Sequence, residues 1–309
     1  MPLILRKCQK NGLSSNNFYY GNVGDVVTCP DWIPNSKCGN GLHGLLEGNG
    51  DWLLLTGEDW LVIEAEKEDI VNIDTDKCKF RTGKILFRGS TEQLANSEFP
   101  NKLKLNSESA YLWARTIGNH DVMMHKITES EYAYHWARHI GNKDIMIDKI
   151  NDSLYAYSWA INIGNRDIMI SKITDSQYAY YWARYIGNHD VMMHKINDSA
   201  YAYFWARDIG NHDIMMHKIT ESKWAYAWAF SIGSYHDVMI NKITDSKDAY
   251  NWALNIGNRN VMMHKITDSY WAYHWAQDIG DQDVMKPKVT ENFYINLWNN
   301  AFPENPIAT

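Results

Sequence analysis

Tryptophan recurs with an almost constant spacing through the last two thirds of this chain of 309 residues. Successive members of the series lie 23 residues apart, except for one interval of 24 residues. The series consists of Trp113, Trp136, Trp159, Trp182, Trp205, Trp228, Trp252, Trp275 and Trp298. A fixed period of this length is typical of repeat proteins, so the spacing predicts a solenoid of about eight stacked repeats.

Each repeat contains the signals of two short helices, which residues 175–197 show clearly. The first helix is predicted to begin at Asp175-Ser176, because an oxygen side chain there can accept from the free N–H groups of the first turn. Gly187 suits the left-handed conformation that ends helices. We expect Asn188 to cap the second helix, which covers about two turns over residues 189–196 and is partly of the 3₁₀ kind.

Spacing also predicts which side chains are buried. Ala179, Ala183 and Ile186 stand at positions i, i+4 and i+7 and form one stripe of the first helix. A small Ala beside a large Trp allows close stacking, so we expect Trp182 to be buried between units. The side chains of the second helix expected to close the core are Val191, Met192 and Ile196. Helices this short melt in isolation, so stacking stabilises each unit and both ends of the array need a cap.

The first 104 residues show no repeat and contain short β-branched or alternating runs broken by Gly, Asn and Asp. The candidate strands are Gly24–Cys29, Trp60–Ala65, Ile70–Ile73 and Lys84–Arg88. The predicted fold class is therefore α+β. It consists of a small β-rich N-terminal domain at 1–104, an α-solenoid of 23-residue two-helix repeats at 105–301 and a C-terminal tail at 302–309. The N-terminal domain and residues 286–309 are expected to cap the two ends of the array.

Composition and charge exclude several classes of function. The net charge is −7, and neither part of the chain has the basic excess that binding a phosphate backbone requires, so nucleic acid is not an expected partner. The chain has no apolar stretch of 18 residues and no apolar run near its start that resembles a signal peptide. We therefore expect no membrane partner and a cytoplasmic location. The cysteines Cys8, Cys29, Cys38 and Cys78 form no C-x-x-C pair, so free thiols are expected, with no metal and no cofactor.

Two charged rows recur with the repeat. A lysine stands near the end of each second helix, at Lys126, Lys149, Lys172, Lys195, Lys218, Lys242, Lys265 and Lys288. An aspartate precedes it by five residues in seven of these units. This aspartate row consists of Asp121, Asp144, Asp167, Asp190, Asp213, Asp237 and Asp283. Both charges suit the helix dipole. Structural pairing within and between units is the favoured interpretation, and a charged stripe for a ligand is the alternative.

The position before that aspartate is basic or a histidine in seven of eight units. It includes Arg166, His189 and His212, which we call the basic row. Because this row lies at predicted helix N-termini, it is the best candidate in the chain for binding carboxylates or phosphates. The alternative is a solvated edge with no ligand.

Two positions four residues apart on the first helix change freely between units while the core pattern stays fixed. They hold Tyr181 and Tyr185 in one unit and Phe204 and Asp208 in the next. Positions four apart share one face of a helix, so we expect this face to be exposed. It is either idle or the surface that binds a partner. One unit has two histidines there, but a stack of zinc sites would need ligands in every unit, so no metal is expected.

A glycine-rich stretch at residues 38–50 contains His43. A Gly-x-His between strands resembles the entry to an ADP-ribosyltransferase-like fold, but no paired catalytic Glu motif accompanies it. No Gly-Lys-Ser/Thr follows the glycines, so this is not a phosphate-loop signature. A structural loop, a binding loop and a catalytic loop stay open as alternatives, and no catalytic residue is predicted.

The Trp-Ala-x-x-Ile-Gly-Asn run of each unit resembles helical repeat proteins encoded by bacteriophages. Its rhythm is similar, in spacing only, to the leucine-rich-repeat variant, a solenoid of alternating α and 3₁₀ helices. The stretches Cys38–Gly44 and Asp76–Phe80 also resemble a domain common in phage proteins of unknown role. The resemblance implies a viral origin and carries no activity with it.

These observations favour a macromolecule-binding protein, because solenoids present extended binding surfaces. With the phage resemblance, the expected task is to bind and block a host protein, such as a defence factor, in the host cytoplasm. The alternative is that the N-terminal domain is a nucleotide-binding or ADP-ribosyltransferase-like enzyme, with the array as its targeting scaffold. A small anion in the loop at residues 39–50 would favour this alternative.

Overall fold

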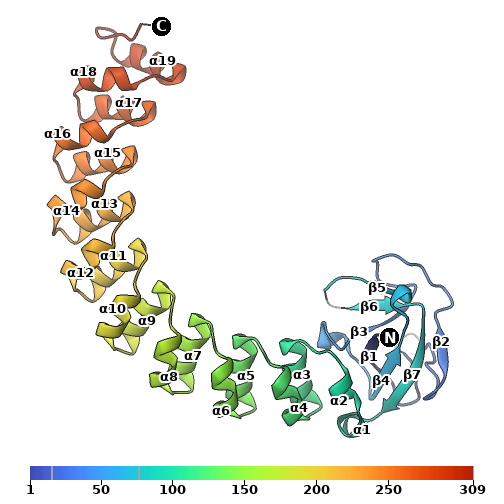
Figure 1. Ribbon diagram of the computed structural model, residues 1–309. Helices are drawn as coiled ribbons and strands as arrows, with labels where there is room; N and C mark the ends of the chain where they lie inside the picture. Colours follow the sequence, from blue (N-terminus) through green and yellow to red (C-terminus); the bar gives the residue numbers. More distant parts are fainter. Residues whose placement is uncertain (15–16, 76, 309) are drawn as a thin grey trace. The chain divides into compact units, whose positions relative to one another are not determined.

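The computed structural model describes residues 1–14, 17–75 and 77–308. Asp76, which belongs to one stretch of the phage resemblance, lies outside the described residues. The chain divides into two compact units, Met1–Lys172 and Ile173–Thr309. The first contains a β-sheet followed by helix pairs, and the second contains further helix pairs (Figure 1). The predicted α+β class is confirmed.

One antiparallel sheet forms the N-terminal domain, with seven strands among the described residues in the order β2-β7-β4-β1-β3-β6-β5. The strands are β1 Leu3–Cys8, β2 Val26–Thr28, β3 Leu42–Leu46, β4 Asp59–Glu64, β5 Ile70–Asn72, β6 Cys78–Phe80 and β7 Thr82–Gly89. Two 3₁₀ turns, η1 Trp52–Leu54 and η2 Lys67–Asp69, lie between strands. All four candidate strands overlap an observed strand, whereas β1, β3 and β6 were not predicted.

Strand β3 lies inside the glycine-rich stretch, and its glycine has a packing role. A Cβ atom on Gly44 would lie 2.4 Å from the Ile4 side chain on β1, so only glycine lets these two strands approach. β1 and β4 are central in the sheet, and their side chains Ile4, Leu5, Leu61 and Ile63 are fully buried. Apolar side chains on both faces remove the alternating pattern by which a half-buried strand is recognised.

The sheet is joined to the first repeat through specific contacts. Helices α1 Thr91–Ala95 and α2 Phe99–Lys102 follow the last strand. The Asn49 side chain donates to the carbonyl of Lys104 at 2.9 Å and accepts from the N–H of Asn106 at 2.8 Å. The Trp52 ring lies 6.0 Å, edge to face, from the ring of Trp113, the first member of the tryptophan series. The N-terminal domain therefore covers the exposed end of the first repeat.

The repeats are pairs of helices, as predicted, except that the last first helix has no second helix after it among the described residues (Figure 1). The first helices are α3 Ser107–Thr116, α5 Ser130–His139, α7 Ser153–Asn162, α9 Ser176–Tyr185, α11 Ser199–Asp208, α13 Ser222–Ser231, α15 Ser246–Asn255, α17 Ser269–Asp278 and α19 Asn292–Ala301. The second helices are α4 His120–Lys126, α6 Lys143–Met146, α8 Arg166–Lys172, α10 His189–Lys195, α12 His212–Lys218, α14 His236–Lys242, α16 Arg259–Met262 and α18 Gln282–Met285. Three of the second helices continue as 3₁₀ turns, η3 Ile147–Lys149, η4 Met263–Lys265 and η5 Lys286–Lys288.

The helix ends follow the sequence signals with one correction. The Asp175 side chain accepts from the N–H of Gln177 and caps α9, as predicted. Gly187 has φ +112°, in the region that favours glycine. Asn188, however, makes no side-chain cap; it adopts the left-handed conformation, with φ 57° and ψ 43°. Asn is used here because it tolerates this backbone conformation better than other residues with a Cβ atom.

The single 24-residue interval is absorbed between two helices, as its position predicts. Helix α13 ends at Ser231 and α14 begins at His236, so the extra residue lies in the connecting loop. The carbonyl of Ser234 in this loop accepts from the Trp228 indole N–H at 3.1 Å. The insertion therefore leaves the helix register intact, as expected for a loop.

The core of each unit contains one fully buried tryptophan. In α9, Trp182 and Ala179 are 0% exposed and Ala183 is also buried. In α10, Met192 is buried, but Val191 is 47% exposed, so its assignment to the core was wrong. Each residue advances about 100° around a helix, and the inward face of α10 begins one residue later than predicted.

Lysine and serine side chains connect successive repeats. Each lysine of the recurring row donates from Nζ to a main-chain carbonyl of the preceding segment, over 2.6–2.8 Å. No ion pair between these lysines and the aspartate row occurs in the described part of the chain. The favoured pairing of lysine with aspartate was therefore wrong, although the lysines do connect successive units, because their acceptors are main-chain carbonyls.

The buried serines make the reverse connection. Ser199, for example, accepts from the N–H of Thr220 at the end of its own unit at 2.9 Å and from that of Glu221, the first residue of the next unit, at 3.3 Å. Serine was expected only to help begin the helix. The end of the chain closes over α19, where the carbonyl of Asn305 accepts from the Trp298 indole N–H at 2.8 Å.

Candidate functional site

The four residues predicted at the variable positions lie near one another on α9 and α11. Tyr181 and Phe204 are half-buried, whereas Tyr185 is 63% exposed. Tyr180 links them, because its ring centroid lies 5.5 Å from that of Tyr181 and 6.2 Å from that of Phe204. The predicted residues therefore form one surface, joined by a buried tyrosine that the sequence did not single out.

Asp208 is held by three donors. Arg184 Nη1 lies 2.7 Å from its Oδ2, Arg207 Nε lies 2.7 Å from its Oδ1, and the Tyr180 hydroxyl donates to it. These hydrogen bonds, that from Arg207 above all, lower the pKa of Asp208 to about 2. Burial, followed by the hydrogen bond to this carboxylate, raises the pKa of Tyr180. Asp208 is thus a fixed anion that orients two arginines, not a carboxylate free for proton transfer.

The two arginines are the residues that sequence reasoning missed. Their side chains are each 45% exposed. Arg184 Cζ lies 5.6 Å from the ring centroid of Tyr185, and Arg207 Cζ lies 5.1 Å from that of Phe204. Arg184 also follows Tyr180, and Arg207 follows Tyr203, by four residues. In a helix this spacing places the guanidinium over the ring, and it was available in the sequence. We call Tyr181, Arg184, Tyr185, Phe204, Arg207 and Asp208 the aromatic–arginine patch.

The second of the two variable positions, which Tyr185 and Asp208 occupy, contributes to packing in other units as well. There it holds Asn162, Ser231 or Asp278. The Tyr134 hydroxyl accepts from Asn162 at 3.0 Å, and the Tyr203 hydroxyl lies 2.7 Å from Ser231 Oγ. Likewise, Tyr250 donates to Asp278 at 2.5 Å. In these units the position holds a polar side chain that meets a tyrosine of the preceding repeat. Its variation is therefore limited by this contact.

The basic row points back toward its own unit. His212 Nε2 lies 2.9 Å from the carbonyl of Ala206, and Arg166 Nε donates to that of Ala160 at 3.4 Å. The His189 ring packs edge-on against the Trp205 ring, with centroids 6.1 Å apart. These contacts satisfy carbonyls at the end of the first helix and cover the next tryptophan. Anion binding by this row stays a prediction, and an anion would compete with those carbonyls.

A row of aliphatic side chains also faces outward from the second helices. It comprises Ile145, Ile168, Val191, Ile214, Val261 and Val284, which are 38–47% exposed. This exposure was not predicted, because an apolar residue inside an amphipathic helix ordinarily lies on the buried face. The row is the same in chemical type from unit to unit, whereas the aromatic–arginine patch is confined to two units.

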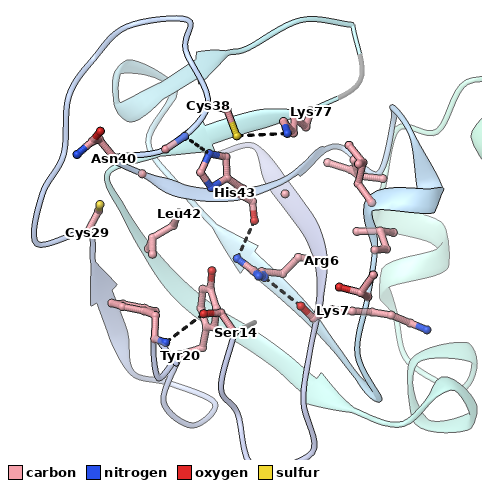
Figure 2. A pocket seen from close by; sticks show the side chains of 18 of the residues that line it. Arg6, Lys7, Ser14, Tyr20, Cys29, Cys38, Asn40, Leu42, His43 and Lys77 are labelled. Carbon is pink, nitrogen blue, oxygen red and sulfur yellow. Dashed lines mark hydrogen bonds between the residues drawn. The ribbon is translucent and has the colours of Figure 1, made fainter. Parts of the chain in front are cut away.

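His43 lies on β3 at the wall of a cavity of about 550 Å³ in the N-terminal domain (Figure 2). Its Nε2 accepts from the N–H of Gly39 at 3.4 Å. Burial, and then the nearby cations Lys77, Arg6 and Lys79, lower the pKa of His43. Asp31 also lines the cavity and is occupied by Cys29 Sγ and Asn40 Nδ2, at 3.0 and 2.9 Å. Within the described residues no carboxylate is hydrogen-bonded to the His43 ring, so none orients it as a general base.

The glycine-rich loop is held in place by a buried lysine. Lys79 is 0% exposed, and its Nζ donates to the Asn35 side chain at 2.8 Å and to the carbonyls of Lys37 and Gly39 at 2.9 and 3.1 Å. A Cβ atom on Gly41 would lie 2.9 Å from the Lys79 side chain. The loop is therefore both structural and part of a cavity wall.

All four cysteines are free thiols, of which only Cys38 is exposed. Across the described ranges no cluster of three or more His, Cys, Asp or Glu side chains could hold a metal ion. In the same residues no helix is long and apolar enough to cross a membrane. Comparison with protein-family models, with curated proteins and with solved structures finds no match.

Proposed function

We propose that this chain is a macromolecule-binding repeat protein of phage origin, which binds and blocks a bacterial host protein such as a defence factor in the host cytoplasm. The observation that carries the binding role is the aromatic–arginine patch. Tyrosine, aromatic and arginine side chains are enriched among the residues that dominate binding energy in protein interfaces. The phage origin and the host target rest on the sequence resemblance alone.

The geometry of the patch supports protein binding in two ways. The Asp208 network fixes Arg184 and Arg207 before binding, so less side-chain freedom is lost when a partner is bound. The two guanidiniums exceed the one carboxylate by one positive charge, which suits a partner that presents acidic groups or carbonyls beside an apolar surface. Tyr185, 63% exposed, supplies aromatic surface next to these charges.

The experiment compares two double variants of the full chain as bait in bacterial lysate, with captured proteins identified by mass spectrometry. Tyr185→Ala/Phe204→Ala removes the patch aromatics. Val191→Ala/Ile214→Ala is the matched control, because these exposed aliphatic side chains lie on α10 and α12 of the same two units.

We expect the wild type and the control to capture the same host protein. The patch variant should bind it about 30-fold or more weakly, the loss typical of two hot-spot residues. Equal capture by both variants with unchanged melting temperatures would contradict the proposal for this surface.

A further inference from the structure

The cavity beside His43 contains a charge with no counter-ion in the described part of the chain. Arg6 on β1 lines it, donating from Nη1 to the carbonyl of His43 at 2.8 Å and from Nε to that of Lys7 at 3.2 Å (Figure 2). Its guanidinium lies over the Tyr20 ring, 4.0 Å from the centroid. None of the ion pairs among the described residues involves Arg6.

Burial lowers the pKa of Arg6 to about 10, so the guanidinium is still charged at neutral pH. A cation removed from water is costly unless a partner of opposite charge compensates it. Carbonyl oxygens compensate only in part, because they carry no net charge. This arrangement is therefore expected where an anionic ligand completes the site.

A second cation stands at the same cavity. Lys77 also lines it, and its Nζ lies 3.5 Å from Cys38 Sγ. Lys7 does not contribute in the same way, because its ammonium lies over the Trp60 ring, 4.5 Å from the centroid. Among the described residues that line the cavity, Asp31 is the single acidic group, and its carboxylate accepts from Cys29 and Asn40 rather than from Arg6 or Lys77. Neither Arg6 nor Lys77 forms an ion pair with a described carboxylate, and two unpaired cations match a dianion better than a singly charged group.

Size and lining describe the rest of the ligand. The cavity volume of about 550 Å³ lies within the range of about 300–1,000 Å³ that is typical of small-molecule sites. Inorganic phosphate would leave most of this space unfilled. Phe18, Leu42, Leu54 and Leu55 supply apolar surface to the same cavity.

We propose that the cavity of the N-terminal domain binds a small organic phosphate of about nucleotide size, with the phosphate between Arg6 and Lys77 and the organic part against the apolar side chains. Arg6 is suited to the phosphate because its planar guanidinium can present two parallel N–H donors. The site lies apart from the aromatic–arginine patch in sequence and in chemistry, so it is independent of the protein binding proposed above.

Cys38 gives a test that reports on this cavity alone. Cys38 lines the cavity and is exposed, whereas burial raises the pKa of the Cys8, Cys29 and Cys78 thiols and makes them unreactive. The rate of Cys38 labelling by Ellman's reagent is measured on the full chain at pH 7.5 with AMP, ribose 5-phosphate, adenosine or inorganic phosphate. Isothermal titration calorimetry on the same samples gives the affinity.

We expect at least one of the two organic phosphates to slow labelling in a saturable way and to bind more tightly than inorganic phosphate, with no effect of adenosine. Arg6→Gln should abolish this protection. Lys77→Gln, at the cavity rim, should weaken binding about tenfold, as for loss of one charged hydrogen bond. Arg81→Gln is the control, because its side chain is exposed and does not line the cavity.

No protection by either organic phosphate at millimolar concentration would overturn the proposal. So would protection that is unchanged by Lys77→Gln in a variant that melts like the wild type. The patch variant Tyr185→Ala/Phe204→Ala should bind the organic phosphate normally, which separates failure of this site from failure of the array surface.

Discussion

Removal of one connecting lysine should weaken the array measurably. Lys218 donates from Nζ to the carbonyl of Ile196 at 2.7 Å, and Ile196 is fully buried. Lys218→Met keeps most of the aliphatic stem but leaves that carbonyl without this donor. A hydrogen bond from a charged group contributes about 1.5–3 kcal/mol, and the Lys218 side chain is only half-buried, so we expect a loss of about 2 kcal/mol.

The assay is unfolding in urea, monitored by tryptophan fluorescence. The dependence of the unfolding free energy on urea concentration is compared between variants. Lys218→Met/Lys265→Met should lose about 4 kcal/mol, because these connections lie two units apart and make no contact with each other. Lys247→Met, on the exposed face of α15, is the control and should stay within about 0.5 kcal/mol of the wild type.

The same experiment separates a backbone acceptor from an aspartate acceptor. If lysine paired with aspartate, Asp190→Asn would destabilise the array as much as removal of the lysine, and salt would weaken both effects. With a carbonyl acceptor, Asp190→Asn should lose only the helix-dipole contribution, about 0.3–1 kcal/mol. If Lys218→Met were as stable as the wild type, the reasoning would be refuted. The hydrogen bond to the carbonyl would then be no more favourable than the hydrogen bonds that the ammonium makes with water.

Three further results are expected. Trp182→Ala should destabilise the protein by about 3–5 kcal/mol, since the side chain is 0% exposed, and an unchanged melting temperature would contradict the burial of the tryptophan series. Asp208 has a pKa of about 2, below its ordinary value of 3.8, so its stabilising effect is complete above about pH 4 and is lost as the pH falls toward 2; the melting-temperature difference between the wild type and Asp208→Asn should shrink over that range. Asn188→Ala should lose about 1 kcal/mol in urea unfolding because φ is 57°, whereas Asn188→Gly should be nearly neutral; equal losses would show that the side chain matters.

The sequence predicted what depends on periodicity and on local capping. The helix pairs, the buried tryptophans and the loop insertion before His236 follow from spacing, because period and burial are linked in a helix. Val191 was misplaced because an error of one residue rotates a side chain by about 100°. The role of Asn188 was misread because Asn is common both as a cap and in the left-handed conformation.

The contacts that the sequence did not predict are those whose partner is a backbone atom far along the chain. Ser199 and Lys218 bind main-chain groups of Glu221 and Ile196 in neighbouring repeats, and a main-chain group has no identity that a sequence could reveal. Arg6 was missed for a related reason, since its surroundings come from β3 and from the glycine-rich loop rather than from neighbours in the chain. Only part of the aromatic–arginine patch was predicted, because the position of Arg184 and Arg207 was overlooked although it too differs between repeats.

These backbone connections also explain where the surface is free to vary. Because serine and lysine bind main-chain atoms, stacking does not depend on which side chains the outer face carries. The second variable position is less free, since Ser231 and Asp278 meet a tyrosine of the preceding unit. Freedom is greatest at the position of Arg184 and Arg207, where exposure and chemical variety coincide. Substitutions there can change the outer surface without loss of the array, so tests of the proposed binding should begin at this position.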